Sequence, residues 1–387
     1  MAKPNKLWRL SASLLALLLL PGCWDRTELN DMAFTLATAV DAAPDNRMIV
    51  TVEVPIPAKL GKNAGAGDPY VVVSTEAATM RNATQLQSTR MSRRVSSSHR
   101  RVMIIGEELA KKGIRPLFDN FSRVPENRLN GILVIAKGKA SELLKGKTPV
   151  DEFSWEALRE IVRGRGRTVN NMKNVAQALS LNGRDPIVIY MGTMETKENG
   201  KNQIQLLGYA QFREDKMIGI YQDGAMNGIH WLNGQITPHE MTVALPSGQF
   251  LTVYIFEGST RIRPTIGSNN KVTFHATVNN TFFILEDFGE LDFNDLHNVQ
   301  LVKKEIGKAI ERDMQKCFEQ MQKDGTDSVA LGSRLFRKYP RIWKERLEAD
   351  WRDKGLKEAE LIVRVESHVS HTGLISDNLA KEEKDVK

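Results

Sequence analysis

The residue best suited to a chemical modification is Cys23, which follows a short apolar run near the start of the chain. Lys3, Lys6 and Arg9 precede that run, which covers residues 10–20. Basic residues followed by an apolar run are typical of a secretion signal. The run is shorter than the about 20 residues that a membrane-spanning helix needs, so the segment is predicted to be a signal peptide.

The residues around Cys23 have the pattern of a bacterial lipobox, in which a signal peptide is cut directly before a cysteine. Leu20, Pro21 and Gly22 precede Cys23, and the proline departs from the commonest lipoboxes. In this interpretation residues 1–22 are a lipoprotein signal peptide, and Cys23 becomes the N-terminus and carries a covalent lipid. The alternative is a secreted protein that is cut after Gly22 and whose cysteine is incidental.

A second candidate site is the densest basic cluster of the chain, which spans the end of a predicted helix and the start of a predicted strand. The cluster consists of Arg90, Arg93, Arg94, Arg100 and Arg101. Such residues can contact anionic lipid headgroups or an acidic surface of a partner protein. They can equally form a solvated face without a partner, and the sequence leaves both interpretations open.

The other residues with catalytic or metal-binding potential form no recognisable constellation. Two histidines on one face are four residues apart on a helix or two apart on a strand, whereas His368 and His371 are three apart in a predicted strand. The sequence has no Gly-x-Ser-x-Gly elbow, no P-loop and no Cys-x-x-Cys motif. We therefore expect no enzyme activity, no metal site and no cofactor other than the lipid on Cys23.

Composition and charge limit the classes of partner. The chain has 387 residues with a formal charge of +7, and removal of residues 1–22 takes away Lys3, Lys6 and Arg9. The remaining basicity fits a protein held near anionic headgroups and is too diffuse to indicate nucleic-acid binding. Residues 163–167 (RGRGR) contain too few glycines and no stacking aromatic residues for an RNA-binding segment.

Cys317 is the only thiol left once Cys23 is acylated, so no intramolecular disulfide is expected. Apolar residues at three- and four-residue spacings surround it in a predicted helix; they are Val299, Val302, Ile306, Ile310, Met314 and Met321. This pattern predicts a buried structural thiol.

The first part of the mature chain is predicted to be a mixed α/β domain over residues 23–195. Two apolar segments around a turn sequence predict a β-hairpin over residues 33–40 and 48–56. Further strands are predicted at residues 71–74, 101–105, 131–136 and 187–191. Helices are predicted at residues 77–95, 107–121 with a break at Pro116, 155–162 and 171–181. Strands that alternate with helices indicate a mixed sheet with helical cover.

The polar stretch over residues 195–202 is predicted to end this domain. Residues 203–266 are predicted as a β-rich middle domain, with strands at 206–212, 216–221, 242–245, 251–256 and 261–265. Residues 267–375 are predicted as a C-terminal α+β domain, with strands at 271–285 and 359–369 and helices at 296–322, 328–338 and 341–351. Residues 376–387 are charged and predicted to be disordered. The expected fold is multi-domain α+β, with three domains and with mixed and antiparallel sheets covered by helices.

Four separated segments resemble, in the same order, one family of bacterial lipoproteins. They are residues 23–30 (CWDRTELN), 92–106 (SRRVSSSHRRVMIIG), 207–236 with its GIHWL motif, and 335–351 (LFRKYPRIWKERLEADW). The chain thus resembles the Ger(x)C family, the C subunits of spore nutrient-germinant receptors. The conspicuous aromatic residues of these segments, Trp231, Trp343 and Trp351, are predicted to pack in the core.

The resemblance implies a lipoprotein without catalytic activity, anchored through Cys23 on the outer face of the inner spore membrane. It would act with membrane-embedded A and B subunits in the assembly and signalling of the nutrient response that triggers germination. An alternative is a substrate-binding lipoprotein of an ABC importer, but such proteins usually have two similar α/β lobes. A surface hydrolase would need a nucleophile, a base and an orienting acid, which the sequence does not show at recognisable spacing.

Overall fold

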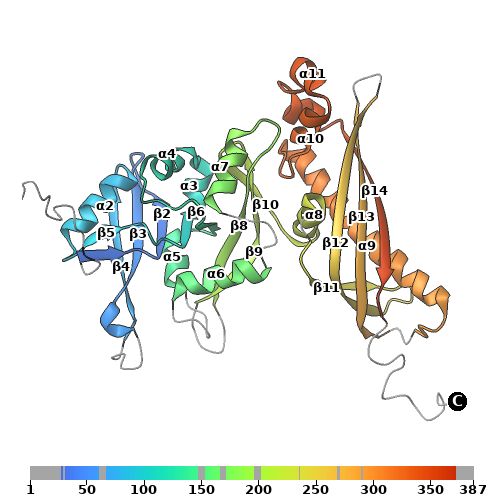
Figure 1. The fold of residues 1–387 in the computed structure, drawn as a ribbon, viewed down its shortest axis with the longest axis horizontal. Coiled ribbons are helices and arrows are strands. Elements are labelled where there is room, and N and C mark those ends of the chain that lie inside the picture. Colours follow the sequence, from blue (N-terminus) through green and yellow to red (C-terminus); the bar gives the residue numbers. More distant parts are fainter. Residues whose placement is uncertain are drawn as a thin grey trace, which may run out of the picture.

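The structure is a computed structural model, and it describes residues 28, 31–60, 67–146, 153–165, 171–195, 202–234, 236–267, 271–288 and 291–371. These residues form one sheet of eight strands and one of four, which lie side by side in Figure 1. A small further sheet pairs β1 (Met32–Phe34) in parallel with β5 (Arg94–Ser96).

The first sheet has the strand order β10-β9-β8-β7-β6-β2-β3-β4. Its strands are β2 (Ala37–Ala42), β3 (Met48–Pro55), β4 (Tyr70–Ala77), β6 (Val102–Gly106), β7 (Ile132–Ala136), β8 (Ile187–Glu195), β9 (Asn202–Arg213) and β10 (Lys216–Tyr221). The central strands β2, β6, β7 and β8 are parallel, and antiparallel hairpins extend the sheet on both sides. Every residue of β6 is buried, because helices cover both faces of a parallel sheet.

Helices cover the two faces of the first sheet and divide its apolar side chains into two cores. The helices are α2 (Met80–Thr89), α3 (Glu107–Lys112), α4 (Arg115–Arg123), α5 (Ala140–Lys145), α6 (Ser154–Arg165) and α7 (Met172–Ser180). Ile104 and Leu158 belong to the core under α5 and α6. Ile105 and Phe121 belong to the core under α2, α3, α4 and α7. Neighbouring residues of β6 face opposite cores because side chains alternate along a strand.

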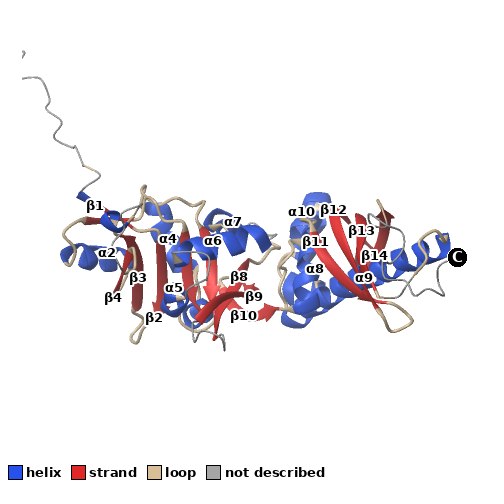
Figure 2. Ribbon diagram, turned by 90° about the horizontal axis from the view of Figure 1, so that it is seen from below, coloured by secondary structure: helices blue, strands red, loops and turns tan. Residues whose placement is uncertain are grey.

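The second sheet is open on one face. Its strands, in order, are β11 (His239–Ala244), β12 (Phe250–Ile266), β13 (Val272–Asp287) and β14 (Glu360–Val369). Helices α8 (Asp223–Asn233), α9 (Leu296–Asp324) and α10 (Leu331–Lys338) lie on one side of it, as Figure 2 shows for α8 and α9. Buried and more exposed residues alternate along most of β13, as expected for a sheet with one solvated face.

The segment after α10 contains α11 (Pro340–Ile342) and two π-helical turns, η3 (Trp343–Leu347) and η4 (Trp351–Gly355). Trp343 and Trp351 are buried there, and their rings meet edge to face at 5.6 Å. The prediction that these tryptophans pack in the core is confirmed.

The α+β fold class with mixed and antiparallel sheets is confirmed, but three predicted details differ. The helix predicted over residues 77–95 ends at Thr89, and Arg94–Ser96 form strand β5 instead. Residues 203–266 do not form a sheet of their own: β9 and β10 complete the first sheet, and β11 and β12 belong to the second. The two predicted strands at 251–256 and 261–265 are one strand, β12. Residues 257–260 between them are polar and resemble a turn in the sequence. In the structure they continue the pairing of β12 with β13.

Glu53 in β3 is an exception to the apolar interior of the first sheet. Its side chain is 0 % exposed, and no cation among the described residues accompanies it. Burial raises the pKa of Glu53 to about 8, and the Ser154 hydroxyl opposes this rise only in part. The folded protein therefore holds a proton at pH 7 that the unfolded chain, with a carboxyl pKa near 4.5, releases. The free energy of unfolding must fall as the pH rises from about 4.5 to 8.

Glu53→Gln is expected to raise the free energy of unfolding by roughly 3 kcal/mol at pH 7 and to have little effect at pH 4. Urea unfolding of both proteins across this pH range measures the difference. Glu76→Gln is the control, because Glu76 is exposed on the neighbouring β4 and pairs with Arg47 at 2.7 Å. If the free energy of unfolding depends on pH equally in the wild type and in Glu53→Gln, the raised pKa assigned to Glu53 is contradicted.

Candidate functional site

A buried ion pair joins the two sheet-based parts of the chain. Asp185 lies just before β8 and is 1 % exposed, and Arg352 lies in η4. Arg352 Nη2 donates to Asp185 Oδ1 at 2.9 Å, and Arg352 Nε donates to Asp185 Oδ2 at 2.9 Å. The same carboxylate accepts the backbone N–H groups of Glu214 at 2.8 Å and of Asp327 at 2.7 Å. Asp185 therefore fastens three separate segments. We call this contact region the junction.

A second buried carboxylate extends the junction. Asp327, in the loop between α9 and α10, is 0 % exposed. It accepts the N–H groups of Leu331 at 2.7 Å and Gly332 at 2.6 Å and the indole Nε1–H of Trp351 at 2.9 Å. Burial raises the pKa of Asp327 to about 6, against the lowering effect of these donated hydrogen bonds. The group is ionised at neutral pH, where it orders the start of α10.

A hydroxyl cluster forms the next layer of the junction. The Tyr221 hydroxyl of β10 lies 2.8 Å from Ser328 Oγ and 3.2 Å from Thr326 Oγ1. Gln211 Nε2 of β9 donates to Thr326 Oγ1 at 2.7 Å. Burial is the largest cause of the raised pKa of Tyr221. Because buried polar groups without partners are costly, these bonds fix the last strands of the first sheet against the loop after α9.

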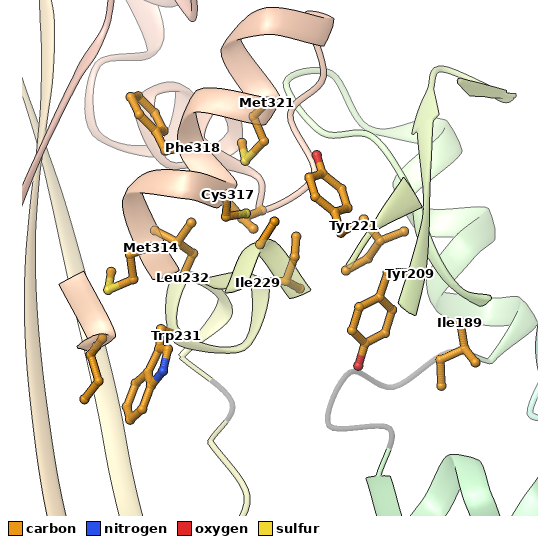
Figure 3. Close-up of a cluster of buried hydrophobic side chains, with 14 of the residues drawn as sticks. Ile189, Tyr209, Tyr221, Ile229, Trp231, Leu232, Met314, Cys317, Phe318 and Met321 are labelled. Carbon is orange, nitrogen blue, oxygen red and sulfur yellow. The ribbon is translucent and has the colours of Figure 1, made fainter. Parts of the chain in front are cut away.

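Apolar packing continues across the junction, as Figure 3 shows. Ile229 and Leu232 of α8 face Cys317 and its neighbours on α9, while Tyr209 lies on the side of the first sheet. All of these residues belong to one continuous core cluster. The junction thus resembles the interior of a domain more than a contact between surfaces.

Two glycines allow the closest backbone approach in the junction. A Cβ on Gly183, which has φ +68°, would lie 2.7 Å from the carbonyl carbon of Gly332 and 2.8 Å from Trp343 Cη2. A side chain does not fit at this distance, and a positive φ also favours glycine. The backbone before β8 therefore rests directly on α10.

The residues of the GIHWL motif and Cys317 lie in the core, as predicted. Trp231 is 1 % exposed and Cys317 is 0 % exposed. Burial raises the pKa of the Cys317 thiol, so the thiol is unreactive at neutral pH. These residues support the packing of α8 on α9.

The five arginines of the predicted basic cluster lie around β5, at the end of the first sheet away from the junction. Arg90, Arg93, Arg94 and Arg101 are exposed, and Arg94 pairs with Glu126 at 3.4 Å. Arg100 is 4 % exposed, so its inclusion in a surface cluster is wrong. The physical reason is that Arg100 and Arg101 project to opposite sides of the chain where it enters β6.

Two family models match almost the whole of the described chain. "Spore germination protein N-terminal domain" matches residues 25–193, and "Spore germination B3/GerAC like, C-terminal" matches residues 207–373. The chain belongs to the Ger(x)C family. The family predicted from the four sequence segments is therefore confirmed. The first match ends within β8, and the second begins within β9.

Several Bacillus subtilis relatives of this Ger(x)C chain match it over nearly their full length. The putative spore germination protein YfkR is 27% identical, and the match covers 88% of this chain and 90% of the relative. Spore germination protein KC is 25% identical, with 96% and 97% covered. The crystal structure of the GerBC protein has a TM-score of 0.55 and 18% identity, and covers 86% of this chain and 96% of that chain. It shares the fold.

Cys23 and residues 1–22 lie outside the described residues. Within the described part of the Ger(x)C chain, no helix is long and apolar enough to cross a membrane. The same part contains no group of three or more His, Cys, Asp or Glu side chains that could hold a metal ion. His368 and His371 are not brought together with other such side chains there.

Sequence reasoning missed the junction residues Asp185, Asp327 and Arg352. The available signal was an acidic residue in a turn next to a buried strand or helix, which is a common arrangement. Only the fold brings these side chains together, since 142 residues separate Asp185 from Asp327 and 167 separate it from Arg352.

Proposed function

We propose that this chain is a membrane-anchored lipoprotein subunit of a spore germinant receptor. Cys23 carries the lipid, and the protein resides on the outer face of the inner spore membrane. It binds the membrane-embedded A and B subunits and takes part in receptor assembly and in the signalling that triggers germination, without catalysis. The observation that carries the proposal is the match to both Ger(x)C family models in order along the chain.

The register of β1 supports a position of the first sheet near the membrane. Met32 pairs with Arg94, and Met32 follows Cys23 by only nine positions in the sequence. Nine positions along the chain span at most about 30 Å, which limits the distance between the proposed anchor and the Met32–Arg94 pair. Figure 2 shows β1 at the end of the first sheet that is farther from the second sheet. The second sheet then extends away from the anchored end.

A lipid anchor makes a weak protein contact effective. One or two acyl chains hold the protein at the bilayer, where its local concentration around membrane-embedded partners is high. The carboxylates and core side chains of the junction connect the two sheets directly. Assembly and signal passage therefore need no reactive group on this chain.

The proposal is tested by purification from dormant-spore inner membranes in mild detergent, with an affinity tag at the C-terminus. Mass spectrometry is expected to identify two multi-pass membrane proteins that co-purify with the chain. Co-purification of a permease and an ATPase would instead support an importer lipoprotein. Absence of the chain from spore membranes would contradict the receptor proposal.

Cys23→Ala is expected to abolish incorporation of labelled palmitate into the chain and to reduce its share in the membrane fraction, because the acceptor thiol is removed. Cys317→Ala is the matched control, since it removes the other cysteine and leaves the proposed acceptor in place. Gel fluorography and fractionation measure both effects. Labelling that survives in Cys23→Ala and disappears in Cys317→Ala would reject Cys23 as the lipidation site.

A further inference from the structure

Arg100 is a buried cation that has no carboxylate partner among the described residues. Its guanidinium lies over the Phe121 ring at 4.9 Å, and its Nη2 donates to Asn127 Oδ1 at 3.0 Å. Its Nε is buried and has no hydrogen-bond partner among the described residues. Burial lowers the pKa of Arg100 to about 10, but the group stays charged at neutral pH. Buried charges are normally paired with an opposite charge, so a counter-charge is expected near the Arg100 guanidinium.

A small cavity lies beside Arg100, between β2, β3, α2 and α4. Its volume is ≈ 30 Å³, which is room for one or two water-sized groups. Arg81 and Arg100 both line it, and Glu126 is the one acidic residue among the lining residues. Glu126 is directed to exposed Arg94 at 3.4 Å. The balance of charge around the cavity is therefore positive.

The lining offers donors that nothing in the described protein uses. Thr38 is 3 % exposed and lines the cavity, and its hydroxyl makes no hydrogen bond with the described residues. Ser97 and Asn127, by contrast, are bonded to each other at 2.9 Å. The unused donors are thus Arg100 Nε and the Thr38 hydroxyl, with the Arg81 guanidinium as a further cation.

We propose that this cavity is a binding site for one small monovalent anion, of the size of chloride or of a single carboxylate group. Arg100 is the principal ligand, the Thr38 hydroxyl donates a second hydrogen bond, and Arg81 adds positive charge. The small volume excludes larger organic anions. This inference does not depend on the proposed receptor function, because it rests on the packing of the first sheet alone.

The bound anion would stabilise the end of the first sheet beside β1 and β5. It would neutralise Arg100 where α2 and α4 pack against β2 and β3, and an anion that binds only the folded state raises the free energy of unfolding by RT ln(1 + [L]/Kd). The exposed arginines nearby, Arg90, Arg93, Arg94 and Arg101, favour the approach of an anion by their field.

The test uses the full-length chain in detergent micelles, with isethionate salts that hold the ionic strength constant, because this sulfonate carries no carboxylate group. Chloride is the probe, and the line width of its NMR signal reports exchange with a protein site; acetate is then added as a competitor. Arg100→Met is expected to weaken chloride binding about tenfold or more. Arg101→Met is the matched control, because it removes an exposed charge at the next position and should leave the binding unchanged.

Thr38→Val provides a second variant that keeps the charge and shape of the cavity, and it is expected to weaken binding by a smaller factor. It keeps the proposal testable if Arg100→Met fails to fold. Displacement of chloride by acetate would show that a carboxylate occupies the same site, whereas broadening that resists acetate would assign the site to halide. Equal broadening in the wild type, Arg100→Met and Thr38→Val, or an equal loss in Arg101→Met, would overturn the proposal.

Discussion

Asp185→Ala is expected to lower the free energy of unfolding by about 3–5 kcal/mol, which is a large part of the stability of an ordinary domain. The substitution leaves Arg352 in the junction without its carboxylate, although the Arg352 side chain is only 24% exposed. It also leaves the N–H groups of Glu214 and Asp327 without their acceptor. Urea unfolding followed by tryptophan fluorescence measures the loss, because Trp351 lies in the same network.

The matched control for Asp185→Ala is Asp353→Ala, which breaks a more exposed ion pair of the junction region. Arg213 Nη2 lies 2.8 Å from Asp353 Oδ1, but the two side chains are 39% and 63% exposed. Exposed ion pairs contribute about 0–1 kcal/mol, so this variant should unfold almost like the wild type. The double variant Asp185→Leu with Arg352→Met is expected to recover part of the loss, since it buries no unpaired charge. Similar losses in the two single variants would contradict the role assigned to burial.

Gly228→Ala is expected to destabilise the protein by about 3 kcal/mol or more, at the upper end of the cost of overpacking. A Cβ at this position in α8 would lie 2.2 Å from the Asp313 carbonyl oxygen and 2.6 Å from Cys317 Cβ. Both atoms belong to α9, whose backbone cannot move without disturbing the second sheet. The higher helix propensity of alanine offsets only about 1 kcal/mol of this cost.

Gly307→Ala is the control for Gly228→Ala because it adds the same methyl group to a helix with space around it. The nearest atom to a Cβ there is Val365 Cβ at 3.6 Å, which is an ordinary contact. This substitution in α9 is expected to raise the free energy of unfolding by up to about 1 kcal/mol. Thermal and urea unfolding of both variants test the comparison. A stable Gly228→Ala protein would show that α8 and α9 pack less tightly than the structure indicates.

Several local elements of the fold follow from the sequence to within a few residues, although α2 is shorter than the helix predicted over residues 77–95. The hairpin of β2 and β3, the break between α3 and α4 before Pro116, and the long helix α9 were all predicted from apolar spacing and turn residues. Such signals are local, because one turn of helix or one pair of strand residues already shows which face is buried. The burial of Cys317 and Trp231 followed from the same spacing.

Pairing over long distances was harder to predict. The sequence indicated a hairpin of β9 and β10 but did not show that it joins β8 at the edge of the first sheet. A hairpin exposes two edges, and the whole topology decides which edge pairs with another strand. For this reason residues 203–266 were expected to form a domain of their own.

The sequence by itself predicted the lipobox at Cys23, and it identified the family, the fold class and most of the elements. Each of these signals depends on residues that are close together in the chain. Only the tertiary structure decided that Asp185, Asp327 and Arg352 meet, and that Arg100 is buried while Arg101 is exposed. Five arginines look alike in a basic cluster. The exposure of their side chains differs, because the direction of each side chain depends on where the strand begins and on which helices cover it.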